Sequence, residues 1–268
     1  MGETDMRIEY GILVVYNQPI ERSSSYATFK DQLSILVADN STTQELRNNN
    51  RRQVEQDGNF YLDMKGNQGL SKAYNQAISL LQQKEQKPCF VMIMDDDTLF
   101  ENDFLNKAAQ EMQSVQADVY VPIVKAEEQI LSPCMIHRGR VKAIHDLSSI
   151  TRENITAINS GMIVSLNVYQ KIRYNENLFL EYIDHDFIRQ LKKHQYSIHI
   201  LKQQIQQNFS VFENDKASAK TRFSILKKDL HVFYGKSLSQ HFLYKSILWK
   251  RKLRAVIQYK DLSIVWKW

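Results

Sequence analysis

Apolar residues gather in short runs along the first hundred residues, and each run stops at polar or turn-forming residues. Runs of this length that are rich in β-branched and aromatic residues predict buried strands. Strands that alternate with helices predict an α/β fold, with a mostly parallel sheet flanked by helices on both faces. The expected strands span residues 8–16, 33–38, 59–64 and 89–94, and the expected helices span 20–31, 43–56 and 71–84.

The second half of the chain carries weaker patterns. Residues 126–155 look irregular, and residues 185–194 predict a basic helix. The other expected elements are a helix over 102–115, a strand over 118–124, an apolar run over 162–166 with a helix to about Arg173, and a short strand over 198–201. Repeats and low-complexity linkers are absent from the sequence.

Three polar features hold equivalent places in the first half, each just beyond the end of an expected strand. Asp39 follows the second strand, the turn 66–69 follows the third, and Asp95 to Asp97 follow the fourth. In open α/β sheets, ligands bind outside the carboxyl ends of the strands. We therefore expect the three features to converge on one ligand-binding edge.

Asp95, Asp96 and Asp97 place three carboxylates together at the end of a buried strand. Their repulsion is unfavourable unless a cation or hydrogen-bond donors offset it. Oxygen ligands suit Mg²⁺ or Mn²⁺, which commonly bridge to phosphates. The alternative is a helix start, since acids favour a first turn and Thr98 would help to cap it. Three adjacent acids exceed what a cap requires, which favours a divalent-cation site.

Two further segments carry candidate chemistry. Residues 66–75 combine glycines, which allow a ligand to approach the backbone, with a helix N-terminus, which favours anions. An ordinary loop explains that segment equally well. Residues 179–186 place Asp184 at a loop–helix junction, where a carboxylate can act as a general base. The alternative there is capping by Asp184, with Asp186 in the first helical turn.

The net charge of +5 is unevenly distributed. Residues 216–268 hold thirteen Lys and Arg against two acids, about +11, which leaves residues 1–215 at −6. We therefore expect a catalytic domain over 1–215 and a basic helical extension over 216–268. Apolar and basic residues mix over 240–258 at near-helical spacing, typical of a helix that lies on an anionic membrane or packs on a subunit.

The remaining composition narrows the class of protein. Cys89 and Cys134 are far apart and form no CxxC pair, which argues against a zinc site and fits a reducing, cytoplasmic compartment. The pI of about 9.0 raises the alternative of a nucleic-acid-binding module. Clustered acids would repel phosphates unless a metal is bound, so we expect no nucleic acid as partner.

In combination, these segments resemble the family 2 glycosyltransferases of the GT-A fold, especially the bacterial polysaccharide branch that includes rhamnosyl- and galactofuranosyltransferases. The landmarks occur in the family's order over roughly residues 8–200: VVYNQP, VADNST, GNQGLSKAYN, MIMDDDT, then NSGMIV and FLEYIDHD. The resemblance implies a Rossmann-like GT-A sheet. It also implies an inverting, metal-dependent transfer of a sugar from a UDP- or dTDP-sugar to an acceptor hydroxyl, in bacterial capsule or cell-surface polysaccharide synthesis.

The resemblance further implies roles for individual residues. By position, Asp184 is the catalytic base and Asp97 binds Mn²⁺ or Mg²⁺. Asp95 lies on the nucleotide side and is the second expected metal ligand, and Asp96 lies nearby in the donor site. The other donor-nucleotide residues are Tyr16, Asn17, Pro19, Asp39, Asn67, Gly69 and Lys72, and the acceptor and sugar region contains Asn159, Ser160, Gly161 and Glu181.

The sequence departs from the family in three places. Many relatives have Asp at the position of Glu181, and many carry a His soon after the strand expected at 198–201. Here that stretch has no His, and we interpret His199, within the strand, as structural. The glycine-rich GGxxGG loop of the rhamnosyl- and galactofuranosyltransferases is GLSKAYN here, so the sequence does not identify the donor sugar.

Two alternatives from other classes stay open. A sugar-nucleotide nucleotidyltransferase would use a similar acidic motif, but usually with a Gly-rich basic loop where this chain has YNQP. A non-catalytic nucleotide-sugar-binding protein is the other. The expected partners are a nucleotide-sugar donor, a saccharide or lipid-linked saccharide acceptor, an anionic membrane surface and a second copy of the chain in a homodimer. The expected location is cytoplasmic, peripheral on the inner face of the cell membrane.

Overall fold

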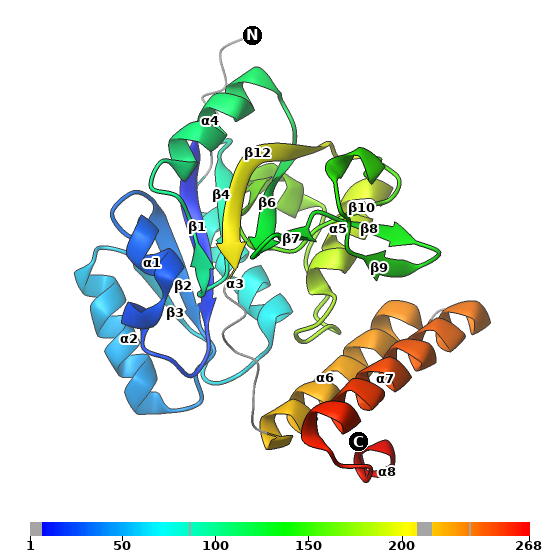
Figure 1. Ribbon diagram of the computed structural model, residues 1–268. Coiled ribbons are helices and arrows are strands. Elements are labelled where there is room, and N and C mark those ends of the chain that lie inside the picture. The colour runs from blue at the N-terminus through cyan, green and yellow to red at the C-terminus, as the bar shows by residue number, and fades with distance from the viewer. Residues whose placement is uncertain (1–6, 86, 208–215, 236) are drawn as a thin grey trace.

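The protein is described by a computed structural model that covers residues 7–85, 87–207, 216–235 and 237–268. A nine-stranded sheet with helices on both faces forms its centre, which confirms the α/β fold (Figure 1). The strand order is β3 (Phe60–Asp63), β2 (Ser34–Asp39), β1 (Ile8–Val15), β4 (Phe90–Met94), β11 (Met162–Ser165), β6 (Val119–Ala126), β12 (Ile198–Gln207) and β5 (Thr98–Leu99), with β7 (Gln129–Ser132) paired to β6. Strands β5, β7 and β11 run antiparallel to their partners, and the other pairs are parallel.

Strand β1 is buried on both faces, as its nearly continuous apolar sequence predicts. Ile12 and Val14 pack into the core on one face, and Leu13 and Val15 pack into the core on the other. On the first face the core includes α3 (Leu70–Lys84), α5 (Ile183–Lys193) and α6 (Lys216–Tyr234). On the second face it includes α1 (Ser24–Phe29), α2 (Gln44–Gln56) and α4 (Phe104–Ser114).

The helix expected at 20–31 is divided into a 3-10 turn, Ile20–Arg22, and the short α1. The hydroxyls of Ser41 and Thr42, just before α2, join two loops. Ser41 Oγ accepts a hydrogen bond from the backbone N–H of Asn17 at 2.9 Å, and Thr42 Oγ1 donates to Asn17 Oδ1 at 3.0 Å. The loops after β1 and β2 are therefore fastened to each other.

The prediction of irregular structure over 126–155 is wrong. Besides β7, this segment contributes to a second, three-stranded sheet. Its strands are short and lie partly at the surface, so the sequence lacks the apolar runs that mark the central strands. The order in this sheet is β10 (Ile155–Thr156), β8 (Cys134–His137) and β9 (Arg140–Lys142), and a 3-10 turn, Leu147–Ser149, precedes β10.

Two further elements differ in extent from the expectation. β12 continues well past the expected end at residue 201, because its backbone stays paired with β6 as far as Gln206, through a polar stretch that lacks an apolar run. The helix expected before Arg173 is a 3-10 helix, Leu166–Gln170. His199 pairs with Glu111, its Nε2 lying 2.8 Å from Oε1, which supports a structural role.

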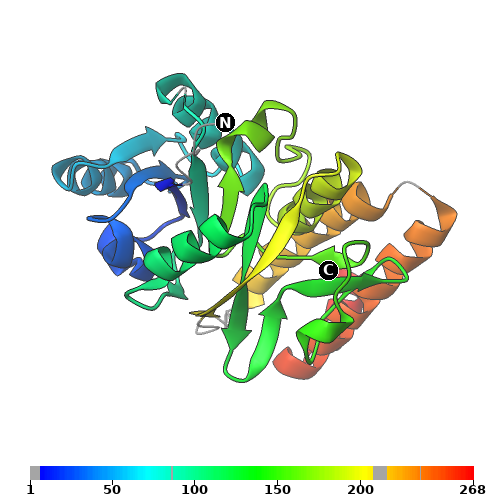
Figure 2. The ribbon, with the colours of Figure 1, turned by 90° about the horizontal axis from the view of Figure 1, so that it is seen from above.

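The C-terminal segment forms α6, α7 (Leu238–Tyr259) and the short α8 (Ile264–Lys267). α6 and α7 run side by side at one side of the molecule (Figures 1 and 2). α6 buries Phe223, Leu226 and Leu230 in the same core as α3 and α5. In the part of the chain that the structure describes, no helix has the length and apolar character needed to cross a bilayer.

Candidate active site

The loops after β1, β2 and β4 meet at one edge of the sheet, as the polar positions predict. Asn40 joins the first two and the turn at 66–69: its N–H donates to Val15 O at 2.9 Å, and its side-chain Oδ1 accepts from Gln68 N at 3.2 Å. Asp184 lies near enough to this edge that its charge raises the pKa of Asp95. The charges of Asp96, Asp97 and Asp184 therefore all act on Asp95 at this edge.

Asp95 follows the last residue of β4. Burial raises the pKa of Asp95 to about 7, and the charges of Asp97, Asp96 and Asp184 act in the same direction. The Ser160 hydroxyl donates a hydrogen bond to Asp95 Oδ2 and opposes the rise. A carboxyl whose pKa lies this close to neutrality is a marker of a functional site.

The neighbouring carboxyls are perturbed in the same way. Burial, and next the charge of Asp97, raises the pKa of Asp96 to about 6, while Gln18 donates a hydrogen bond to Asp96 Oδ2. Burial also raises the pKa of Asp97, and a hydrogen bond from Gln207 opposes that rise. Gln207 Nε2 also lies 3.4 Å from Asp95 Oδ2. The acidic run therefore concentrates negative charge that bound cations would offset.

Serines at the start of α1 hold the backbone of the acidic run. Ser23 Oγ and the backbone N–H of Ser24 both donate to Asp96 O at 3.0 Å. Ser25 Oγ donates to Asp95 O. The turn that presents the three carboxylates is therefore fixed from a second element.

The donor set fits a divalent cation that takes part of its coordination shell from a ligand. Among the described residues, no three or more His, Cys, Asp or Glu side chains lie close enough together to hold a metal. A full protein cage is therefore missing from this part of the chain. Mg²⁺ commonly binds through one or two carboxylates together with phosphate oxygens and water. Asp97 and Asp95 offer such a pair of carboxylates.

The predicted donor-nucleotide residues after β1 lie at the surface. The Tyr16 side chain is 51% exposed. Asn17 adopts a left-handed conformation, φ 52, and its Oδ1 accepts a hydrogen bond from the backbone N–H of Thr42 at 2.8 Å. Pro19 begins the 3-10 turn that follows. These residues line the open side of the edge.

Asp39 is fully buried. Its carboxylate accepts hydrogen bonds from the backbone N–H of Ser41 at 2.8 Å, from Asn50 Nδ2 at 2.8 Å and from Tyr61 OH at 2.9 Å. In the structure Asp39 therefore holds the loop after β2 in place. Its role in binding the donor nucleotide stays a prediction.

The turn before α3 touches the acceptor-side segment. Asn67 Oδ1 accepts from the backbone N–H of Gly69 at 3.1 Å. Gly69 has φ 84, and a Cβ added there would lie 2.8 Å from Phe179 O. Leu70 N donates to that carbonyl at 2.7 Å. Glycine is thus required here by a close backbone approach, and Lys72 lies partly exposed in the next turn.

Asp184 is the second residue of α5, which begins after Tyr182 in a left-handed conformation. Its side chain is 18% exposed, and its Oδ1 accepts from the backbone N–H of His185 at 2.7 Å. Asp186, by contrast, is buried and binds Arg189 and Gln190 within the helix. Of the two acids, Asp184 is the more exposed, and its role as the base stays a prediction.

The residues of the acceptor region lie in two places. Asn159 and Ser160 are buried beside the acidic run, where Asn159 Oδ1 accepts from Tyr174 OH at 3.2 Å. Gly161 has φ 69, and an added Cβ would lie 2.9 Å from Ile205 Cδ1. Glu181 lies in the loop before α5 and pairs with Arg222 Nε of α6 at 3.1 Å.

The profile of Glycosyl transferase family 2 matches residues 14–179, more than half of the chain. The chain belongs to this family. It is therefore a glycosyltransferase, as the motifs predict. The match spans the loop after β1, the turn at 66–69 and the whole acidic run. Among curated proteins, none matches the chain in sequence.

Solved glycosyltransferases confirm the GT-A fold. S. aureus TarS, residues 1–349, has a TM-score of 0.51 at 15% identity, over 97% of this chain and 75% of that chain. TarS in complex with UDP-GlcNAc has a TM-score of 0.50 at 16% identity, over 90% and 70% of the two chains. GalNAc-T7 with UDP, GalNAc and Mn²⁺ has a TM-score of 0.60 at 10% identity, over 86% of this chain and 48% of that chain. Identities this low establish the fold alone.

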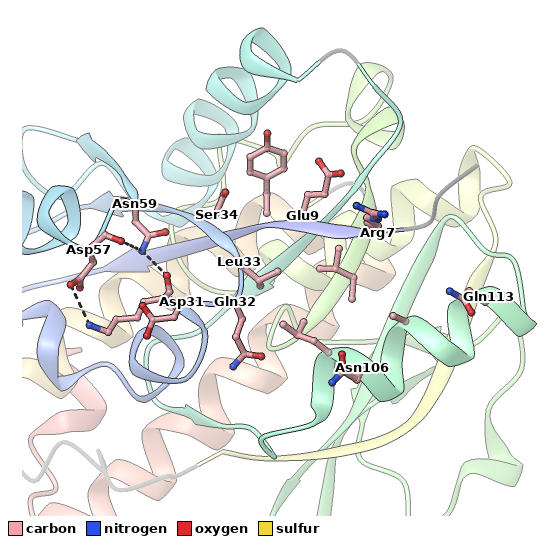
Figure 3. A pocket seen from close by; sticks show the side chains of 16 residues that line it. Arg7, Glu9, Asp31, Gln32, Leu33, Ser34, Asp57, Asn59, Asn106 and Gln113 are labelled. Atoms are coloured by element: carbon pink, nitrogen blue, oxygen red, sulfur yellow. Dashed lines mark hydrogen bonds and ion pairs between the residues drawn. The ribbon is translucent and has the colours of Figure 1, made fainter. Parts of the chain in front are cut away.

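The glycosyltransferase also has a broad hollow at the opposite edge of the sheet, with a volume of about 980 Å³ (Figure 3). It lies at the amino ends of β1 and β2, lined by residues such as Glu9, Asp31 and Gln32. Lys30 and Asp57, on its wall, pair with each other at 3.2 Å. None of the family's landmark motifs contributes to it, so the acidic edge remains the candidate site.

Sequence reasoning missed three polar side chains that shape the site. Gln18 lies inside the YNQP landmark, which is a signal that was available. Gln207 ends β12, in the stretch that carries a His in many relatives, and its amide reaches Asp95. Asp229 of α6 contacts the loop before α5. Its only sequence signal is that it is one of two acids in a strongly basic extension.

Proposed function

We propose that this glycosyltransferase moves a sugar from a UDP- or dTDP-sugar to an acceptor hydroxyl with inversion at the anomeric carbon, assisted by Mn²⁺ or Mg²⁺. The observation that carries the proposal is that Asp184 lies close enough to the acidic run for its charge to act on Asp95. In the proposal, Asp184 acts as the base. Asp95, Asp96 and Asp97 surround the diphosphate and its cation.

The chemistry is a single displacement. Asp184 accepts the proton of the acceptor hydroxyl while that oxygen bonds to the anomeric carbon. The bond from this carbon to the diphosphate oxygen breaks on the opposite face, so the configuration inverts and the nucleoside diphosphate leaves. A divalent cation, when bound, supplies positive charge that stabilises the leaving diphosphate. Asp97 and Asp95 would hold it, and in the proposal the nucleotide binds beside Asn17 and Tyr16.

The donor class is supported by the ligands of similar structures. TarS was solved with UDP and with UDP-GlcNAc, and GalNAc-T7 was solved with UDP, GalNAc and Mn²⁺. We extend a nucleotide-sugar donor and a divalent cation to this chain as part of the proposal. The donor sugar itself is left open, because the GLSKAYN segment differs from the glycine-rich loop of the rhamnosyl- and galactofuranosyltransferases.

The surface of α7 supports a membrane-associated acceptor. Apolar side chains at helical spacing are exposed along α7, with Phe242 at 73% and Ile257 at 77%. Lys and Arg residues on the same helix give it positive charge, which suits an anionic lipid surface. We propose that α7 lies on an anionic membrane, and that the acceptor is a lipid-linked saccharide of a cell-surface or capsule polysaccharide. The exposed apolar residues are Leu238, Phe242, Trp249, Leu253 and Ile257.

The test is a panel of UDP- and dTDP-sugars, with and without Mn²⁺, in which nucleoside diphosphate release is measured for the wild type and for Asp184→Asn. The amide has nearly the shape of the carboxylate but cannot take up the proton. We expect transfer to fall ~10²–10⁴-fold in this variant while UDP binding persists. Wild-type turnover in Asp184→Asn would refute the base. Formation of UTP or dTTP and a sugar 1-phosphate when pyrophosphate is added would indicate a nucleotidyltransferase, and donor binding without any turnover would indicate a non-catalytic binding protein.

A further inference from the structure

Asp229 is the acidic residue of α6 and is buried, with 1% of its surface exposed. Its carboxylate accepts three hydrogen bonds from consecutive backbone N–H groups. Phe179 N donates to Oδ1 at 2.9 Å, and Leu180 N and Glu181 N donate to Oδ2 at 2.9 and 2.8 Å. A buried carboxylate is favourable only where donors replace its lost hydration, and three N–H groups supply that replacement.

The segment that Asp229 holds lies between the two halves of the candidate site. On one side, Phe179 O accepts a hydrogen bond from Leu70 N at the start of α3, directly after Gly69. On the other side, the segment leads through Tyr182, with φ 64, into α5 and Asp184. One carboxylate from the C-terminal extension therefore fixes the backbone that connects the donor-side turn with the base.

We propose that Asp229 is a positioning residue for glycosyl transfer, acting through residues 179–181 to set Asp184 relative to the donor. The inference rests on the proposed function, in which Asp184 is the base. Asp229 touches the loop backbone, and its effect on the reaction passes through the geometry of that loop. A displacement of a catalytic group by about 1 Å can reduce a rate ~10²-fold, so a small relaxation of the loop is enough to be measured.

The docking of α6 on the catalytic core has a separate basis. Phe223, Leu226, Leu230 and Phe233 of α6 are buried in the core cluster that also contains α3 and α5. This apolar contact is expected to keep α6 in place when the Asp229 carboxylate is changed. The position of the loop and the folding of the chain can therefore be separated by experiment.

The experiment compares the full-length wild type with Asp229→Asn. The amide keeps one acceptor oxygen and turns an NH₂ donor toward the loop's N–H groups. With the donor that supports turnover, we expect kcat to fall about 10–100-fold, while UDP affinity changes less than about threefold and the melting temperature moves by only a few degrees. Hydrogen exchange at the amides of Phe179, Leu180 and Glu181 is expected to accelerate in the variant.

The matched control is Asp261→Asn, the same chemical change at the other acid of the extension. Asp261 pairs with Lys216, away from the loop, so kcat is expected to stay at the wild-type value. An unchanged kcat in Asp229→Asn would overturn the inference. So would a loss of UDP affinity and melting temperature that parallels the loss of kcat, because that pattern describes a general loss of structure.

A measurement on the wild type alone keeps the inference testable if the variant does not fold. The amides of Phe179, Leu180 and Glu181 are expected to exchange slowly although they lie outside helices and strands. Exchange as fast as that of exposed loop amides would show that the three hydrogen bonds are absent, and would overturn the inference. Failure of the proposed function is distinguished by Asp184→Asn: wild-type transfer in that variant refutes the base, whatever Asp229→Asn does.

Discussion

The hydroxyl of Ser160 donates a hydrogen bond to Oδ2 of Asp95, which joins the acceptor-side segment to the acidic run. Ser160 is completely buried, so water does not compete for this contact. The hydrogen bond stabilises the ionised form of Asp95 and lowers its pKa, against the larger effect of burial that raises it to about 7. The protonation state of Asp95 is thus set partly by Ser160, a residue of the predicted acceptor region.

Ser160→Ala is expected to raise the pKa of Asp95 further, since the variant loses the donor that stabilises the carboxylate. The carboxylate binds cations only when ionised, so activity requires a pH above the pKa of Asp95. We expect the acid limb of kcat/KM to move to higher pH by up to ~1 unit, with activity largely recovered at pH 8.5. A pH–rate profile at a fixed Mn²⁺ concentration below saturation checks this, because the proton and the cation then compete for the Asp95 carboxylate. In Ser25→Ala, which loses a contact to the backbone of Asp95 only, the limb should stay in place; a limb that does not move in Ser160→Ala contradicts the assignment.

Asp97→Ala is expected to remove the effect of Mn²⁺ on donor binding, because the variant loses the least buried carboxylate of the acidic run. The loss of cation affinity should be at least ~10–100-fold, the effect expected when even an indirect partner of a metal site is removed. Calorimetric titration of UDP with Mn²⁺ or with chelator measures it. Asp31→Ala, in the hollow at the opposite edge, is the matched control (Figure 3). If Asp97→Ala binds UDP more tightly with Mn²⁺ than with chelator, as the wild type is expected to do, the metal assignment is wrong.

Gly69→Ala is expected to reduce both stability and transfer. An added methyl group would meet the carbonyl of Phe179 at 2.8 Å and would force apart the turn and the loop before α5. A destabilisation of about 1–3 kcal/mol is expected from the strained backbone. Gly66→Ala separates the two effects, because Gly66 also has a positive φ but has no atom within 4 Å of an added Cβ. Thermal melting and turnover are measured for both, and equal losses of turnover would argue against the close approach at Gly69.

The double variant Trp249→Ser, Ile257→Ser removes two exposed apolar side chains of α7. We expect it to bind phosphatidylglycerol vesicles more weakly than the wild type. Full burial of two such side chains is worth about 3–6 kcal/mol, so even partial insertion predicts a loss on the order of 100-fold. Vesicle sedimentation measures the loss, with phosphatidylcholine vesicles to test the charge requirement. Point variants are preferable to truncation after residue 215, which would also remove Asp229 and the apolar cover of the core.

The control for the α7 variant is Val115→Ser, an exposed apolar residue at the end of α4. It should leave vesicle binding unchanged. If instead the α7 variant binds vesicles like the wild type but changes the oligomeric state in light scattering, the exposed face is a contact between subunits. That outcome would replace the membrane by the homodimer as the partner of α7.

The central strands and the acidic run could be predicted from the sequence, and for physical reasons. β1 and β4 are buried on both faces, so their whole length is apolar and the polar residues that follow them stand out. β8 and β9 lie partly at the surface, so their apolar residues do not stand out from the polar residues around them. The sequence therefore predicts irregular structure over 126–155.

The contacts that tie the site together could not be predicted in the same way. Ser160 is 65 residues from Asp95, and Asp229 is 50 residues from Phe179. The second of these contacts ends on backbone N–H groups, which every residue except proline carries, so it leaves no mark in the sequence of the loop. Asp184 was recognised through its family motif, whereas its placement depends on residues outside that motif.

The predicted donor side and acceptor side of the site are connected mainly by hydrogen bonds of the backbone. Leu70 N donates to Phe179 O, and the Asp229 carboxylate accepts from the N–H groups of residues 179–181. The side chains of Leu180 and Glu181 take no part in these hydrogen bonds. These two side chains can therefore be exchanged without breaking the backbone hydrogen bonds that hold the loop. Directed evolution toward new acceptors would find mutable positions here, three or four residues before the base, in a loop whose path is held by other parts of the chain.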